Sequence, residues 1–505
     1  MSLESRPIRF LRRGRIVELD AVPPTRTLLD WLREPGPAGA GCSGTKEGCG
    51  EGDCGACTVA LGELEGGRLR WRPVNSCIRF LASIDGCALV TVDDLRGDDG
   101  SLHPVQQAMV DAHASQCGFC TPGFVMTMYA LYEERLAQRT AGSPPEAVTR
   151  EQAQQALAGN LCRCTGYRPI LDAAQRMLRL PPRGVDEAAI GRQLASIAPS
   201  RGARFASPEG DTWRPHTLDE LLAVRAAQPQ AQIVAGCTDV GLWVNKQHMR
   251  FAGVLDLSSV RELRTIEQTE AATVIGASAR LADAYDALVA RRPQLRAFAD
   301  RFAGPPVRNS GTLGGNLANG SPIGDSMPLL IALGATVRLA GLDGTRELAL
   351  EQLYTGYRKN VIGPREVLTH AVVPAPAAGE LMRAYKLSKR FDDDISAVCL
   401  AISLRLAGGR ATAVRIGVGG MAATPMRAAR TEAALAGAPW SEHTVRAAAQ
   451  VLRDEFTPID DMRASARYRR EAIGNLLWRL WHDSQGRHWN LESLRVEDID
   501  PALRS

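Results

Sequence analysis

The sequence predicts a multidomain α+β protein in which several small modules follow one another. At 505 residues the chain is too long for one hydrophobic core, so two to four domains are expected. Two groups of closely spaced cysteines lie before residue 165, and short strand-like and helical runs alternate after residue 207. These observations divide the chain into domains at 6–94, 95–180, 207–376 and 381–485, with a Pro-, Gly-, Ala- and Ser-rich linker at 181–206.

The composition is ordinary for a soluble globular protein, with 45% hydrophobic and 23% charged residues. A formal net charge of +4 gives no reason to expect nucleic acid or a membrane as a partner. The N-terminus carries charges where a secretory signal needs an apolar core, and no stretch approaches the ~18 apolar residues of a membrane span. We therefore expect a cytoplasmic protein, a compartment in which disulfides are rare.

Residues 6–94 are expected to form a β-grasp module. A hairpin at 7–19 would turn at Arg13-Gly14, and a helix at 25–33 would have Thr25 as its N-cap. Strands are expected near 57–63, 68–73 and 88–92.

The first cysteine group has the plant-type [2Fe–2S] spacing, C-x4-C-x2-C and a fourth cysteine further on. The expected ligands are Cys49, Cys54, Cys57 and Cys77. The glycines among them would allow the backbone to turn its amides toward a cluster: Gly48, Gly50, Gly52 and Gly55. A structural zinc site is the alternative, although zinc ligands usually come as two separated C-x2-C pairs.

Residues 95–180 are expected to form a four-helix module with a second cluster. Apolar stripes predict helices at 103–115 and 124–137, and Pro122 and Pro169 fall where helices would begin. Two cysteine pairs would thus lie in loops before helix N-termini, whose dipoles favour an anionic cluster. These expected ligands are Cys117, Cys120, Cys162 and Cys164. For the remaining cysteines we expect small buried side chains: Cys42, Cys87, Cys237 and Cys399.

Two stretches of small residues follow the linker. Residues 233–240 read as a strand that runs into AGCTDV, and residues 310–322 read SGTLGGNLANGSP. Such loops bring backbone N–H groups against a pyrophosphate, although a turn-rich surface loop explains the second stretch equally well. Further on, a hairpin is expected to turn at Gly408-Gly409, with helices near 426–437, 441–453 and 462–480; the tail at 485–505 is unassigned.

The order of these motifs resembles the molybdenum hydroxylases, the xanthine dehydrogenase and aldehyde oxidase family. The plant-type spacing is followed by CGFCTPG at 117–123 and CRCTGY at 162–167, and the likeness covers roughly residues 6–480. The resemblance implies two [2Fe–2S] clusters, with the helical cluster nearer a molybdopterin and the β-grasp cluster nearer FAD. Gln116 matches a pterin-contacting position in the family, with an ordinary loop glutamine as the alternative.

The same resemblance implies an α+β FAD-binding domain at 207–376 and an α+β flavoprotein C-terminal domain at 381–485. The positions that match FAD contacts are Ile233, Val234, Ala235, Gly236, Cys237, Thr238, Asp239, Val240, Phe302, Thr312, Leu313, Gly314, Gly315, Asn316, Asp325, Leu368 and Lys386. Residues 390–394 resemble a loop beside the flavin that influences access of the electron acceptor, with solvated loop charge as the alternative.

The resemblance implies the electron-transfer subunit of an enzyme that oxidises hypoxanthine and xanthine to urate with NAD as acceptor. Substrate would react on a large molybdopterin-binding partner subunit, in an α2β2 heterotetramer. This chain shows no histidine pair at helical spacing and no G-x-S-x-G motif, so we expect no substrate-oxidising site in it. The alternatives are the same role with an aldehyde or N-heterocycle substrate, or a stand-alone redox carrier or sensor.

Overall fold

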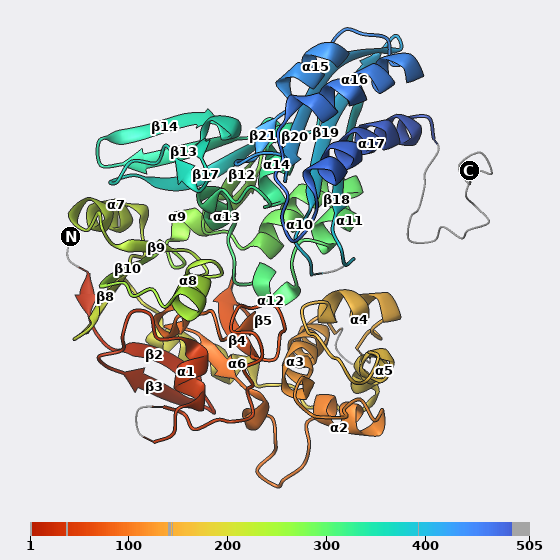
Figure 1. Cartoon of the computed structure of the whole chain (residues 1–505). Coiled ribbons are helices and arrows are strands. Elements are labelled where there is room, and N and C mark those ends of the chain that lie inside the picture. Colours follow the sequence, from red (N-terminus) through yellow and green to blue (C-terminus); the bar gives the residue numbers. More distant parts are fainter. Residues whose placement is uncertain (1–2, 37–38, 140–142, 144, 392, 487–505) are drawn as a thin grey trace.

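Two halves make up the molecule, the N-terminal half below and the C-terminal half above in Figure 1. The computed structural model describes residues 3–36, 39–139, 143, 145–391 and 393–486. The chain is a multidomain protein of mixed helices and strands, as the sequence predicts. None of the helices in this described part is long and apolar enough to cross a membrane.

The first sheet carries the first cysteine group at one end. Its strand order is β3-β2-β6-β4-β5, from β2 (Ile8–Arg12), β3 (Arg15–Leu19), β4 (Thr58–Glu65), β5 (Arg68–Asn75) and β6 (Ala88–Val90). The expected hairpin turn at Arg13-Gly14 is present, and both residues have positive φ. The strands expected in the linear sequence are thus found close to their predicted positions.

The helix of this module begins later than expected. Helix α1 (Leu28–Arg33) has Thr27 as its N-cap, and Thr27 and Asp30 exchange hydrogen bonds in a capping box. The prediction of Thr25 as the cap is wrong because Thr27, not Thr25, has an acidic residue three positions later. The buried face of α1 packs on the sheet, where the Trp31 ring meets Phe10 edge to face at 5.2 Å.

Four helices form the module at the lower right of Figure 1. They are α2 (Pro104–Asp111), α3 (Thr121–Ala137), α4 (Arg150–Leu157) and α5 (Arg168–Arg176). Pro122 and Pro169 lie in the first turns of α3 and α5, which confirms the helix starts predicted from them. The core between the helices contains Phe124, Met128 and Tyr132.

The segment expected to be a linker contains a helix, α6 (Glu187–Ile197). Asp186 caps it by accepting a hydrogen bond from the Ala189 amide at 2.9 Å. Leu194 and Ile197 are buried against the first sheet. The Ala- and Ser-rich composition concealed this amphipathic helix, which ties the segment to the N-terminal half.

Two sheets and several helices form the next part of the chain. One sheet has the order β1-β7-β8-β10-β9, from β1 (Glu4–Ser5), β7 (Ala203–Ser207), β8 (Gly210–Arg214), β9 (Gln232–Val234) and β10 (Gly253–Asp256). The other has the order β11-β12-β17-β13-β14, from β11 (Ile266–Gln268), β12 (Ala272–Gly276), β13 (Thr336–Gly341), β14 (Gly344–Ala349) and β17 (Val367–Pro374). Strand β1 pairs in parallel with β7, so residues at the chain's start join this later sheet.

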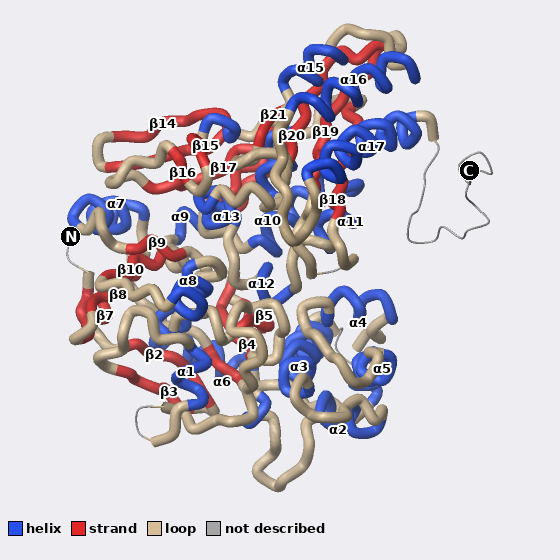
Figure 2. The backbone as a smooth tube through the Cα atoms, viewed as in Figure 1, coloured by secondary structure: helices blue, strands red, loops and turns tan. Residues whose placement is uncertain are grey.

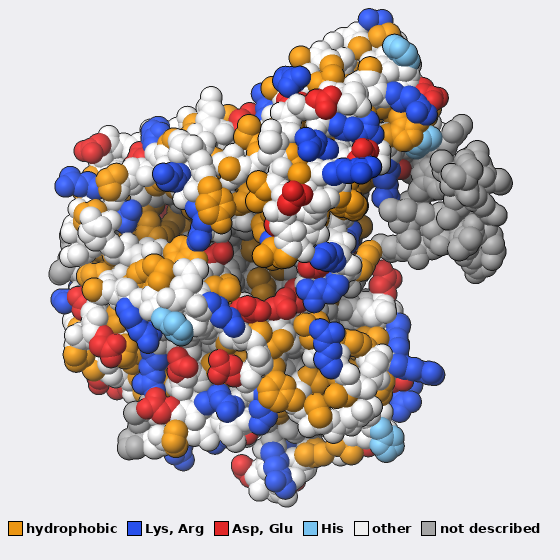
Figure 3. All heavy atoms as spheres, viewed as in Figure 1, with side chains coloured by type: hydrophobic (Ala, Val, Ile, Leu, Met, Phe, Trp, Pro, Cys, Tyr) orange, Lys and Arg blue, Asp and Glu red, His pale blue; other side chains and the backbone are white. Residues whose placement is uncertain are grey.

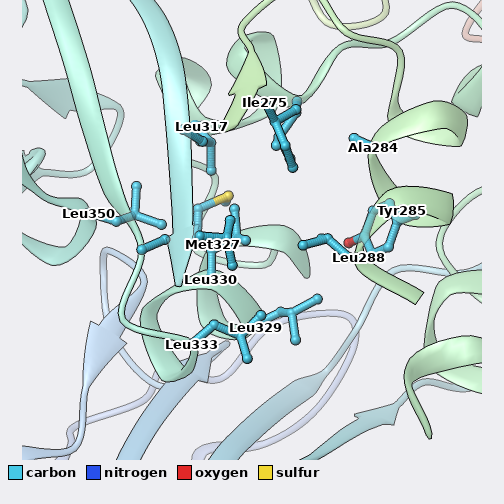
Figure 4. Close-up of a cluster of buried hydrophobic side chains, with 14 of the residues drawn as sticks. Ile275, Ala284, Tyr285, Leu288, Leu317, Met327, Leu329, Leu330, Leu333 and Leu350 are labelled. Carbon is cyan, nitrogen blue, oxygen red and sulfur yellow. The ribbon is translucent and has the colours of Figure 1, made fainter. Parts of the chain in front are cut away.

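The helices around these sheets are α7 (Leu218–Ala227), α8 (Val240–Gln247), α9 (Arg261–Arg264), α10 (Leu281–Arg291), α11 (Arg296–Asp300), α12 (Pro305–Arg308), α13 (Leu313–Asn319) and α14 (Ser326–Ala332). A short ribbon, β15 (Tyr354–Gly356) and β16 (Lys359–Asn360), follows. Figure 4 shows their shared core, in which Met327 and Leu330 of α14 point toward Leu317 of α13 and Leu288 of α10. This core fixes α13, which carries part of the candidate site.

The last domain is a sheet covered on one face by helices, as Figure 2 shows. Its strand order is β18-β19-β20-β21, from β18 (Glu380–Leu387), β19 (Val398–Ala407), β20 (Arg410–Gly419) and β21 (Met426–Arg427). The covering helices are α15 (Ala429–Leu435), α16 (Glu442–Glu455) and α17 (Ala466–Ser484). The predicted hairpin turn at Gly408-Gly409 and the three predicted helices are confirmed, while residues 487–505 lie outside the described part.

Acidic and basic side chains are interspersed over the face of the molecule seen in Figure 3. This surface agrees with the small net charge of +4.

Candidate functional site: two cysteine sets and a small-residue cavity

The first cysteine set gathers at the open end of the β4–β5 hairpin. Thr58 pairs with Asn75 at the end of the ladder, so Cys57 and Cys77 leave adjacent strands side by side. The Cys77 sulfur contacts those of Cys57 and Cys49, and the Cys49 sulfur also contacts Cys54. Hydrogen bonds from the Cys54 and Cys77 thiols lower the pKa of Cys49. The structure therefore brings all four predicted residues together.

The loop around this set turns its amides toward sulfur. The N–H groups of Glu51 and Cys54 both donate to the Cys49 sulfur at 3.4 Å. Gly50, Gly52 and Gly55 have positive φ, as the turning loop requires. Gly48 does not, and it is needed for space instead, because a Cβ there would lie 2.9 Å from the Cys54 sulfur.

The second cysteine set lies at the start of α3 and before α5. Cys120 is the N-cap of α3, and Cys117 and Cys164 have their sulfurs 3.5 Å apart on the surface. Burial, together with the neighbouring Cys162 thiol, raises the pKa of Cys120 to about 12. The four predicted residues thus form two sulfur pairs, 117 with 164 and 120 with 162.

Both sets suit a [2Fe–2S] cluster in their donors. Each iron of such a cluster takes two thiolates, and amide donors to the sulfurs are a known feature of these sites. Within the described residues, no three or more His, Cys, Asp or Glu side chains are grouped as ligands of a single metal ion, whereas a [2Fe–2S] cluster spreads its four thiolates over two irons. The four cysteines outside the two sets are buried, as predicted: Cys42, Cys87, Cys237 and Cys399.

The small-residue stretches line a cavity of about 350 Å³. Its walls include the residues before and at the N-termini of α8 and α13. The predicted residues that line it are Ile233, Ala235, Cys237, Thr238, Asp239, Val240, Thr312, Gly314, Gly315, Asn316 and Leu368. The first amides of α13 already donate to Ala279, Ala277 and Thr312, so the dipoles of the two helix starts are what would favour an anionic group such as a diphosphate.

The stretch at 233–240 is a strand only as far as Val234. Gly236 and Cys237 both have positive φ, which ends β9 and turns the chain into α8. A Cβ on Gly236 would lie 1.7 Å from the Ser310 carbonyl oxygen. This close approach needs a turn, so the strand ends where the AGCTDV stretch begins, as the sequence predicts.

The two glycines of the LGGN sequence have different surroundings. A Cβ on Gly314 would lie 2.4 Å from the Ala277 Cβ, so Gly314 is required for packing α13 on the strand end. A Cβ on Gly315 would meet the Thr312 hydroxyl at 2.9 Å and the Ala235 carbonyl at 3.3 Å. Thr312 caps α13 by accepting from the Gly315 amide at 3.1 Å, so this glycine shapes the cavity wall.

Asn316 offers the most direct test of whether a polar ligand fits. Its Oδ1 atom is buried without a hydrogen-bond partner among the described atoms, and its side chain lines the cavity. Buried polar atoms are normally satisfied, so this acceptor is available to a ligand donor. The cavity therefore fits part of a nucleotide cofactor such as FAD.

Six predicted FAD residues do not line this cavity: Val234, Gly236, Phe302, Leu313, Asp325 and Lys386. Lys386 and Asp325 form a buried ion pair at 2.8 Å. Phe302 packs on Tyr285 with ring centroids 5.0 Å apart, and Tyr285 hydrogen-bonds Ser326, the residue after Asp325. Phe302, Asp325 and Lys386 thus lie together outside the cavity, beside the N-terminus of α14.

Sequence reasoning missed several lining residues. Asn319, Trp243, Arg358 and Asn360 all border the cavity, and the Arg358 guanidinium lies over the Trp243 ring at 4.9 Å. Arg358 and Asn360 come from the β15–β16 ribbon, far along the chain from the small-residue stretches. The run TGYRKN at 355–360 has turn character but carries no motif that would have indicated this position.

Helix α8 connects the cavity with the first cysteine set. Its N-terminus borders the cavity, and from its last turn the Asn245 amide donates to the carbonyls of Gly50 at 2.9 Å and Cys77 at 2.8 Å. A Cβ on Gly241 would lie 2.3 Å from the Ile78 carbonyl oxygen, so the helix packs directly on the cysteine loop. The two sites are therefore braced against one another by one short helix.

The acidic loop at 390–394 contacts the flavin domain and lies near the first cysteine module. The Asp393 carboxylate accepts from the Gly304 amide at 3.0 Å. Burial and the nearby Asp53 carboxylate raise the pKa of Asp393 to about 7. Asp392 lies outside the described residues, so the acidic run is seen only in part.

Three parts of the chain match known protein families. Residues 91–175 match a [2Fe–2S] binding domain, and residues 205–376 match the FAD binding domain in molybdopterin dehydrogenase. Residues 383–484 match the CO dehydrogenase flavoprotein C-terminal domain. These matches support the assignment of iron–sulfur and flavin binding to this chain.

Related proteins carry names that agree with those domains. The xanthine dehydrogenase of Drosophila pseudoobscura pseudoobscura is 33% identical over 94% of this chain and 39% of its own length. The xanthine dehydrogenase/oxidase of Gallus gallus is 31% identical over 88% of this chain and 37% of its own length. The chain thus spans about two fifths of the length of these relatives.

Solved structures give the same family. Carbon monoxide dehydrogenase of Hydrogenophaga pseudoflava is 29% identical, with a TM-score of 0.52 over 55% of this chain and 96% of that one. Quinoline 2-oxidoreductase of Pseudomonas putida 86 is 27% identical, with a TM-score of 0.50 over the same two shares.

Proposed function

Because the chain belongs to the molybdenum hydroxylase family, whose iron–sulfur and flavin domains it carries, we propose that it is the electron-transfer subunit of a xanthine dehydrogenase. A partner subunit with molybdopterin would oxidise hypoxanthine and xanthine to urate, and NAD⁺ would be the final acceptor. An α2β2 assembly of the two subunits is part of the proposal.

The spatial order of the three sites is the observation that carries this proposal. The second cysteine set has Cys117 and Cys164 on the surface, next to exposed Gln116. The first set lies further in, and α8 joins it to the cavity. A chain that holds its sites in this order suits transfer from a partner docked at the exposed cysteines to an acceptor at the flavin.

Each group of residues has its own task in this proposal. The two cysteine sets would each hold a [2Fe–2S] cluster, and the residues of the cavity would hold FAD. When bound, FAD supplies the conversion between single electrons and the hydride that NAD⁺ requires. The residues of this chain orient the groups and fix their separation, while substrate chemistry belongs to the partner.

The purified chain, loaded with its cofactors, is expected to oxidise NADH with an artificial dye, because that half-reaction needs only the flavin site. It is expected not to oxidise xanthine until the molybdenum subunit is added. Steady-state assays of the chain alone and of the reconstituted complex measure both activities. Xanthine oxidation by the isolated chain would contradict the proposal. If the complex oxidised only quinoline or an aldehyde, the role as electron-transfer subunit would stand and xanthine would not be the substrate.

A further inference from the structure

Asn160 joins the two cysteine modules through its side chain. The side chain is 2% exposed, and its amide donates to the Gly55 carbonyl at 3.0 Å and to the Thr58 hydroxyl at 3.2 Å. Its carbonyl oxygen accepts from the Thr127 hydroxyl at 2.7 Å. One buried asparagine therefore ties the first cysteine loop and β4 to α3 of the helical module.

The next residue makes a direct backbone bond between the two sets. The Leu161 amide donates to the Cys54 carbonyl oxygen at 3.0 Å. Leu161 is covalently followed by Cys162, so one hydrogen bond and a few covalent bonds connect a cysteine of one set with a cysteine of the other. Asn160 immediately precedes Leu161, and its side-chain hydrogen bonds hold this backbone segment in place.

Glycines allow the backbone segments to pack closely at the same junction. A Cβ on Gly55 would lie 2.2 Å from the Gly159 carbonyl oxygen, and one on Gly123 would lie 2.2 Å from the Gly55 carbonyl oxygen. A Cβ on Gly304, in the flavin domain, would lie 2.4 Å from the Gly159 Cα. Backbone thus touches backbone here, and side-chain rearrangement cannot absorb a change in separation.

We infer that Asn160 is a positioning residue that fixes the separation of the two cysteine sets and keeps the Leu161–Cys54 bridge closed. The inference rests on the proposed function, in which each set holds a redox cluster. The Gly55 carbonyl also accepts from the Thr58 amide and hydroxyl, so loss of the Asn160 donor would leave it satisfied. It would remove the side-chain bonds that hold the two loops together and free the loops to separate.

The test is the magnetic interaction between the two clusters in the fully reduced full-length chain, measured by low-temperature EPR. This interaction falls steeply with distance, so Asn160→Ala is expected to lose part of the splitting seen in the wild type. Asn160→Asp keeps the acceptor for Thr127 but places a carboxylate oxygen against the Gly55 carbonyl oxygen, and it is expected to lose splitting as well. Splitting preserved in Asn160→Asp would contradict the role given to the amide donor.

Two further variants make the result specific. Asn245→Ala loosens the same cysteine loop from the flavin side and is expected to leave the splitting unchanged. Thr127→Val keeps the shape of the side chain but removes its hydrogen bond to Asn160, and it is expected to lose less of the splitting than Asn160→Ala. Because this change is milder, Thr127→Val also tests the inference if Asn160→Ala does not fold.

The outcomes separate this inference from the proposed function. A wild-type chain without two cluster signals would overturn the proposed function and this inference with it. Two interacting signals whose splitting is the same in wild type, Asn160→Ala and Thr127→Val would overturn this inference alone. Equal loss of splitting in Asn245→Ala would also overturn it, because the effect would then be general loosening of the loop.

Discussion

Cys120→Ala in the complex with the molybdenum subunit is expected to reduce xanthine-dependent NAD⁺ reduction to the background rate. Cys120 is the N-cap of α3 and its thiol lies beside that of Cys162, so its loss would remove one of four thiolates from the second set. The NADH-to-dye reaction is expected to persist, because the flavin cavity lies beyond the first set. Stopped-flow and steady-state assays with each electron donor measure the two activities.

The matched control is Cys87→Ala, the same chemical change at a buried cysteine outside both sets. This variant is expected to keep both activities. Loss of dye reduction in a folded Cys120→Ala protein with normal flavin would contradict the proposed order of sites. Full xanthine-to-NAD⁺ activity in Cys120→Ala would show that this cysteine is not a ligand.

Gly315→Val is expected to yield protein that retains iron but contains little flavin. The new side chain would crowd the Thr312 hydroxyl and the Ala235 carbonyl. It would therefore narrow the cavity between the starts of α8 and α13. The ratio of flavin absorbance to protein, with iron analysis of the same sample, measures this loss.

Gly356→Val is the control within the same domain. The nearest atom to a Cβ at Gly356 is the Lys359 Cδ at 4.0 Å, an ordinary van der Waals distance, whereas a Cβ at Gly315 would meet the Thr312 hydroxyl at 2.9 Å. Normal flavin in Gly356→Val and little in Gly315→Val would support the cavity as the flavin site. Normal flavin in both variants would mean that the cavity holds something else.

Local patterns predicted the parts of this protein whose structure depends on nearby residues. The hairpin at Arg13-Gly14, the helix starts at Pro122 and Pro169 and the hairpin at Gly408-Gly409 all follow from turn and capping chemistry that acts within a few positions. Cysteine spacing indicated both sets because a [2Fe–2S] cluster would need thiols at short, fixed separations, as in the C-x4-C-x2-C, C-x2-C and C-x-C runs.

Other features depend on contacts between distant segments and left no local pattern. Asn160 meets Gly55 across 105 positions, and Asn245 meets Gly50 across 195. The Lys386–Asp325 pair and the β15–β16 ribbon reach their places through packing that spacing does not encode. Helix α6 is different, because Ile190, Leu194 and Ile197 have helical spacing that the composition of the segment obscured.

The central claim is that one chain holds two different [2Fe–2S] clusters and one FAD. Its most direct test is metal and flavin analysis of the purified chain combined with low-temperature EPR after reduction. We expect about four irons and one FAD per chain, with two distinguishable signals, because each cluster contains two irons. A single signal, or zinc in stoichiometric amount at either cysteine set, would contradict the claim.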